Sequence, residues 1–192
     1  PHLHFHVQSS NRLGAPTRPF HLVNVLVREP DGEGEFRLYD VPAEGESVSS
    51  APRDEGLAGA LRMPQGKVIA YRLTGKRPGR VAERFQLRSE RTLLGQSRLQ
   101  GTSGASAAFE ETPYVIGHFD RHGGRDALLD LWLACLGLTP LSTAASLWRD
   151  RPPLALLPLG PLRRAAAALA RPLGAGCEST YRRIWDEAEH AW

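Results

Sequence analysis

The sequence predicts an α+β protein that is mainly antiparallel β, in the form of a small sandwich or barrel, followed by a helical C-terminal region. Three observations predict this class. Two strand-like segments, residues 20–28 and 35–41, flank a turn-forming stretch. Short alternating segments with glycine and proline between them fill residues 67–120. Apolar residues then recur about every 3.6 positions over residues 125–138.

Residues 1–41 are expected to be the end of one β domain. Alternation over His2–Gln8 predicts a strand, and the polar, turn-rich run Ser9–Arg18 follows it. Phe20–Arg28 and Glu35–Val41 are expected to pair as a hairpin, because the intervening Pro30–Gly34 has the composition of a turn.

Residues 54–122 are expected to form a second, β-rich accessory domain, with the polar stretch Pro42–Arg53 as the boundary. Asp54–Arg62 fits one short helix. Strands joined by short turns are typical of antiparallel sheets. Five are predicted: Lys67–Leu73, Arg80–Ser89, Thr92–Gln100, Ser106–Glu111 and Tyr114–Asp120.

Residues 123–192 are expected to form a helical tail. Periodicity predicts a helix at Arg125–Leu138, an alanine-rich helix at Leu162–Leu169 and a last amphipathic helix at Ser179–Trp192. Cys135 lies in the first of these and is expected to be a buried small apolar residue. Whether it pairs with Cys177 is not settled by the sequence.

The segment Leu131–Trp148 contains no charged residue and reaches the length of a membrane-spanning helix. Several polar residues lower its hydrophobicity, and Gly137 and Pro140 interrupt it. We therefore expect a buried helix followed by a loop. A spanning helix is the alternative.

The charge distribution argues against nucleic-acid binding. The chain has 24 basic and 21 acidic residues, a net charge of +3, and arginines interspersed with acids. Nucleic-acid-binding proteins show clustered basic patches instead.

The segment of most chemical interest is Pro1-His2-Leu3-His4-Phe5-His6-Val7. Residues two apart share one face of a strand. His2, His4 and His6 are therefore expected on one side, with apolar residues on the other. Imidazole is a neutral nitrogen donor that suits Zn²⁺, so this strand is a candidate metal-binding strand.

The string Pro1-His2-Leu3-His4-Phe5 resembles the His-x-His motif of the lysostaphin-like (LytM-type) zinc metalloendopeptidases, which cleave peptidoglycan. The resemblance implies that His4 is a zinc ligand and that His2 is the catalytic histidine beside the attacking water. It also implies a peptidoglycan peptide as substrate and a location in the bacterial cell envelope, periplasmic or extracellular.

Two features depart from the family pattern. His6 stands where the family usually has Glu or Gln, so it is at most a partner of the ligands. The family's other two ligands, a His and an Asp from an upstream motif, have no counterpart here. Because the chain also begins inside a strand pattern, we expect a C-terminal fragment of a longer enzyme, inactive alone, with zinc bound in the parent protein.

Other interpretations of the histidine strand remain open. Alternating histidines also occur in cupin-type barrels, although Gln8-Ser9-Ser10-Asn11 offers no carboxylate ligand there. The main alternative is a non-catalytic β-rich binding or scaffold module with a structural histidine strand. Membrane attachment of the parent stays open, and the sequence does not indicate an oligomeric state.

A second cluster is formed by His118, Asp120 and His122, which share a face if the chain is extended. No further ligand lies near them in sequence. We therefore interpret them as a polar strand end that leads into the Gly123-Gly124 turn, with a metal or acid–base site as the alternative.

Overall fold

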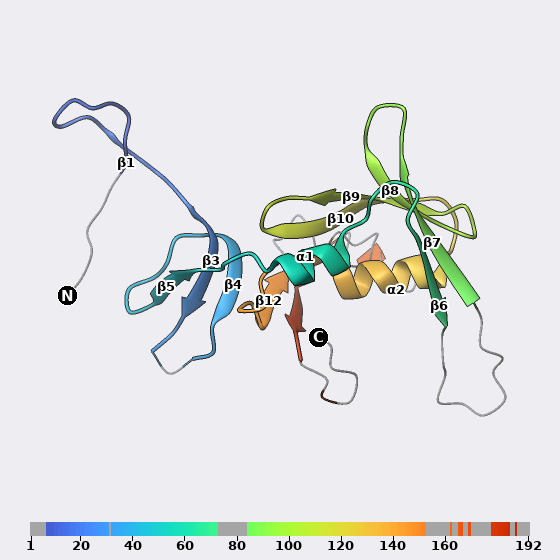
Figure 1. Ribbon diagram of the computed structural model, residues 1–192. Helices are drawn as coiled ribbons and strands as arrows, with labels where there is room; N and C mark the ends of the chain where they lie inside the picture. Colours follow the sequence, from blue (N-terminus) through green and yellow to red (C-terminus); the bar gives the residue numbers. More distant parts are fainter. Residues whose placement is uncertain are drawn as a thin grey trace.

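The computed structural model describes residues 7–30, 32–72, 84–152 and 178–184, together with residues 162, 165, 166, 169 and 187. Two β-sheets and two short helices make up the body, and a separate two-stranded hairpin precedes them (Figure 1). The mainly antiparallel α+β class is confirmed.

The N-terminal hairpin consists of β1 (Val7–Gln8) and β2 (Thr17–Arg18). The first large sheet has the order β13-β12-β4-β3-β5. Its strands β3 (Leu22–Arg28) and β4 (Glu35–Asp40) form the expected hairpin. The other three are β5 (Ser47–Ser50), β12 (Leu147–Asp150) and β13 (Ser179–Arg182).

The second large sheet has six strands in the order β11-β10-β9-β8-β7-β6, all antiparallel. Successive strands are neighbours, because short turns join most of them. They are β6 (Val68–Arg72), β7 (Arg84–Arg91), β8 (Ser97–Gly101), β9 (Ser106–Glu111), β10 (Val115–His122) and β11 (Leu138–Pro140).

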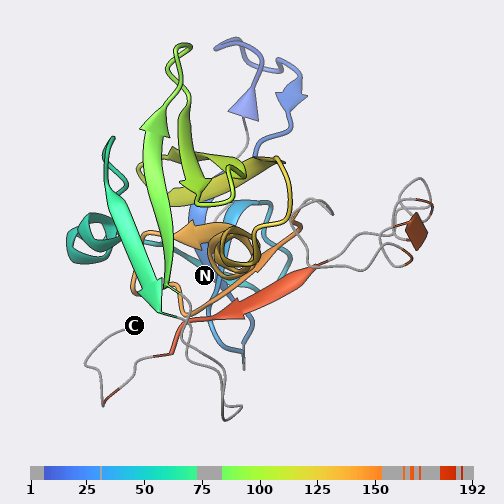
Figure 2. The same ribbon diagram turned by 90° about the vertical axis from the view of Figure 1, so that its right-hand side faces the viewer.

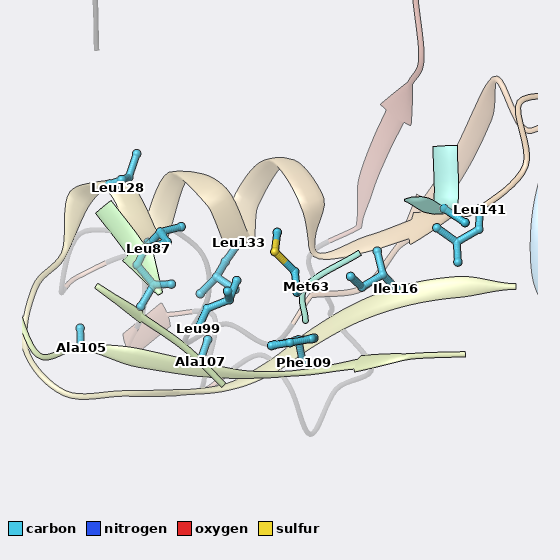
Figure 3. Close-up of a cluster of buried hydrophobic side chains, with 12 residues drawn as sticks. Met63, Leu87, Leu99, Ala105, Ala107, Phe109, Ile116, Leu128, Leu133 and Leu141 are labelled. Carbon is cyan, nitrogen blue, oxygen red and sulfur yellow. The ribbon is translucent and has the colours of Figure 1, made fainter. Parts of the chain in front are cut away.

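Helix α2 (Ala127–Leu136) lies inside the curl of this six-stranded sheet, as the end-on view in Figure 2 shows. Leu129 and Leu133 on the helix are fully buried in one core with Leu87 and Leu99 of the strands. Figure 3 shows Leu133 facing Leu87 and Leu99. The rest of this core comprises Ala58, Met63, Ala105, Ala107, Phe109, Ile116, Leu128 and Leu141.

Side-chain caps fix where both helices begin. Asp54 accepts a hydrogen bond from Leu57 N at 2.8 Å and starts α1 (Glu55–Leu61), which connects the two sheets. Asp126 accepts one from Leu129 N at 2.9 Å and another from Ser103 Oγ at 2.6 Å. A Cβ at Gly101 would lie 2.1 Å from Asp126 Oδ2, so glycine is required there.

Strand β10 contributes to two cores. Ile116 belongs to the core around α2, whereas the adjacent Val115 points to the opposite face and packs with Phe36 and Trp148 of the five-stranded sheet. Trp148 in turn stacks on Tyr181, with ring centroids 5.5 Å apart. The two sheets are therefore joined through β10.

Several sequence predictions differ from the structure. The polar stretch Pro42–Arg53 contains β5, and the predicted tail at 123–192 contains β11, β12 and β13. Because β12 and β13 return to the first sheet, the boundaries near residues 41 and 122 do not separate the sheets.

The helix predicted at Ser179–Trp192 is wrong over its first turn. Residues 179–182 form β13, because pairing with β12 and stacking on Trp148 outweigh local helix propensity. Of the helix predicted at Leu162–Leu169, four residues are described, and all four are helical.

The prediction that Cys135 is buried is also wrong, since its side chain is an exposed free thiol on α2. Cys177 lies outside the described residues. In the uncharged segment, α2 ends at Leu136, as expected for a buried helix, but the chain then enters strand β11 and not a loop. Within the described part of the chain, no helix has the length and apolar character needed to cross a membrane.

We expect Leu129→Ala to lower the free energy of unfolding by about 2–5 kcal/mol, because it leaves a cavity between α2 and the sheet. Leu131→Ala is the matched control on the same helix. Leu131 is 46% exposed, and its truncation is expected to cost less than about 1 kcal/mol. Urea unfolding of both variants tests this. Equal costs would contradict the packing described here.

Candidate functional site

The predicted zinc strand lies outside the described residues, because His2, His4 and His6 all precede Val7. The part of the strand that is described, Val7–Gln8, is extended and pairs with Arg18 and Thr17 of β2. Residues 7–30, 32–72, 84–152 and 178–184 contain no group of three or more His, Cys, Asp or Glu side chains arranged to hold a metal.

His118 is the one member of the second predicted cluster that is buried. Its Nδ1 lies 2.8 Å from the carbonyl oxygen of Leu136, which can only accept a hydrogen bond. Its Nε2 lies 3.2 Å from Trp132 Nε1, which can only donate. These partners select the neutral tautomer with the proton on Nδ1, and they leave no lone pair free for a metal.

Asp120 and His122 do not join His118 in a site. Both side chains are exposed, and the pairing of β10 with β9 shifts register between Phe119 and His122. Asp120 takes a left-handed backbone conformation in this irregularity, with φ of 49°. The interpretation of a polar strand end therefore fits the exposed Asp120 and His122 but not His118, which is buried.

A partly buried ionic cluster on the first sheet was not expected from the sequence. Arg37 binds Asp40 at 2.8 Å and both Glu35 and Glu46 at 3.2 Å, and Arg149 binds Glu35 at 2.9 Å. Every acid in it faces an arginine, so none is poised as a general acid or base. The cluster links β4 to the β4–β5 turn through Glu46 and to β12 through Arg149.

The described residues also form an open groove of about 470 Å³ beside the β7–β8 turn. The groove arises because β8 pairs with β9 only as far as Arg98 and Ala108, while β9 continues to Glu111. Its lining combines apolar and charged groups: Arg62, Met63, Pro64, Gln65, Ser89, Glu90, Arg91, Gly95, Gln96, Ser97, Phe109, Glu110, Glu111 and Phe119.

Charges of both signs lie on the two walls of this groove. Arg62 and Arg91 are exposed on one side and Glu110 on the other, whereas Glu111 is engaged by Arg53 at 3.4 Å. Phe109 and Met63 form a buried apolar floor. Such a lining suits a ligand with amide, charged and apolar groups together. The sequence predicted the strands but not where their pairing ends, so it did not indicate the groove.

Comparison with known proteins adds no relative. No family model matches the chain, and neither a curated protein nor a solved structure is significantly similar to it.

Protonation of His118 is expected to control stability. Burial lowers the pKa of His118 below its ordinary value of about 6.5, although hydrogen bonds at the main chain of Leu136 and Gly137 oppose this. The unfolded imidazole therefore binds a proton more readily than the folded one. The contribution of the neutral His118 to the free energy of unfolding is therefore complete above pH 6.5. It is lost as the pH falls from there through the pKa of the folded state.

Urea unfolding at several pH values tests this. We expect the free energy of unfolding to decline below about pH 6.5 in the wild type. His118→Gln removes this part of the decline, whereas His122→Gln, at an exposed position, keeps the wild-type profile. A profile for His118→Gln parallel to that of the wild type would contradict the assignment.

Proposed function

We propose that this chain contributes the histidine strand of a zinc-dependent endopeptidase of the peptidoglycan-cleaving type. His4 acts as a zinc ligand and His2 as the catalytic histidine, and the observation that carries the proposal is the string Pro1-His2-Leu3-His4-Phe5. The remaining ligands come from a segment outside this sequence, and the β-rich body serves as an accessory part.

The proposal divides the zinc ligands between two segments. A catalytic zinc ion takes about three protein ligands and keeps a fourth position for water. In this proposal His4 supplies one ligand, and the family resemblance places the others in an upstream His and Asp motif. The bound ion lowers the pKa of its water and polarises the peptide carbonyl. His2, two residues away on the same face of an extended chain, is placed to orient that water or to stabilise the oxyanion.

The strand that follows supports the proposal. Alternation over residues 2–8 requires the chain to remain extended, and Val7 and Gln8 do form a strand, paired with β2. A helix or tight turn at these residues would have argued against a shared histidine face.

The groove favours a second candidate, a non-catalytic module that binds an extended peptide. Its floor of Phe109 and Met63 and its walls with Arg62, Arg91 and Glu110 offer contacts to apolar, acidic and basic groups of one ligand. This function is compatible with the first, since an accessory part of a peptidase would hold a peptide strand of the substrate.

Zinc analysis tests the peptidase proposal. The chain alone is expected to hold no stoichiometric zinc, whereas a protein that joins it to the missing ligand segment should hold about one ion. His4→Ala should abolish that zinc. His2→Ala should keep it and lose peptidase activity. His21→Ala, at an exposed position outside the motif, is the matched control and should keep both. Full zinc occupancy in His4→Ala would overturn the assignment.

Peptide titration tests the second candidate. Addition of a peptidoglycan stem peptide to the chain is expected to shift the backbone amide NMR signals of Glu110 and its neighbours in the groove. Arg62→Ser and Glu110→Gln should each weaken the binding, because each removes a charge from one wall. Arg149→Ser, which changes a charge on the other sheet, serves as the control. Shifts spread evenly over the molecule would argue against a groove ligand.

A further inference from the structure

Two protruding turns carry fully exposed leucines. Leu93 and Leu94 occupy the turn between β7 and β8, and Leu13 occupies the turn between β1 and β2. Isolated exposed leucines are common, but adjacent fully exposed leucines at the end of a hairpin are not explained by packing within the chain.

Both turns lie on the same side of the molecule. Figure 1 and Figure 2 differ by a rotation about the vertical axis, and in both views the β1–β2 turn and the β7–β8 turn reach the top of the molecule. The two turns are well separated in Figure 1, so they do not form a single patch. A flat surface on this side of the molecule would contact both turns at once.

The two turn segments contain basic residues and no acidic ones, although Glu90 directly precedes the second segment and lies opposite Arg98 in the β7–β8 pairing. Residues 9–18 contain Arg12 and Arg18 and no acid, and residues 91–98 contain Arg91 and Arg98 and no acid. Neither Arg12 nor Arg91 makes an ion pair with any described residue. This local positive charge contrasts with the near balance of the whole chain.

We propose that these two turns contact the surface of an anionic lipid bilayer. Leucine side chains enter the boundary between headgroups and acyl chains, and the flanking arginines bind anionic headgroups. A planar, fluid surface accepts two convex points at any spacing. A protein partner would need two pockets at a fixed separation, and leucine is under-represented among the residues that dominate protein–protein interfaces. The inference does not depend on zinc or on peptidase activity.

Vesicle co-sedimentation of the full chain tests the proposal. The chain should bind vesicles of phosphatidylcholine with about one-third phosphatidylglycerol and release at high salt, because the headgroup attraction is screened. Binding to pure phosphatidylcholine should be much weaker. The double variant Leu93→Ser, Leu94→Ser should lower the partition coefficient by about tenfold or more, and Leu13→Ser by a smaller factor.

Controls separate surface contact from unfolding. All three leucines are fully exposed, so the variants should keep the circular dichroism spectrum and urea midpoint of the wild type. Val41→Ser, at a position 56% exposed outside both turns, should bind like the wild type. Unchanged binding of the double variant, or equal binding to neutral and anionic vesicles, would overturn the proposal. Unchanged binding of Leu13→Ser would overturn the two-point contact.

Discussion

The burial of α2 in the curled six-stranded sheet is the constraint on which the rest of the structure depends. Leu129 and Leu133 are fully buried against Leu87 and Leu99, and a sheet of this size must curl around such a helix to enclose it. The chain leaves α2 through a single residue, Gly137, and enters β11 at once. The helix is therefore tied at its C-terminal end to the edge of the sheet that it fills, and neither can move without the other.

Strand β10 transmits this constraint to the other half of the molecule. Alternate side chains point to opposite faces, so Ile116 packs toward α2 while Val115 packs with Phe36 and Trp148. Arg183 extends this second core, since it donates to the carbonyl oxygen of Pro140 at 2.8 Å and lies over the Trp148 ring at 5.2 Å. His118, on the same strand, bonds to the end of α2. The side chains of Arg183 and His118 therefore both bond between different elements of the fold.

The sequence predicted the elements that local patterns determine. The β3–β4 hairpin, α1, α2 and most strands of the six-stranded sheet follow from alternation, periodicity, caps and turn residues. It did not predict β12 and β13, because their pairing joins Trp148 to Phe36 and Tyr181 across long separations. The sequence also did not predict the hydrogen-bond partners of His118. Trp132 and Leu136 lie on α2, and no local pattern specifies where this helix packs. The proposal of a histidine strand rests on its motif alone.

The features available for binding lie at the periphery of this body. The groove opens where β8 separates from β9, and the exposed leucines occupy the ends of two hairpins. The β1–β2 hairpin directly follows the histidine motif that carries the proposed zinc chemistry. His4 is three residues from Val7, and three extended residues span at most about 10 Å. A bilayer contact at the β1–β2 turn would therefore hold the proposed zinc ligand at a short, bounded distance from the hairpin that anchors it. If both proposals hold, surface attachment and peptide cleavage take place within a bounded distance of each other on one chain.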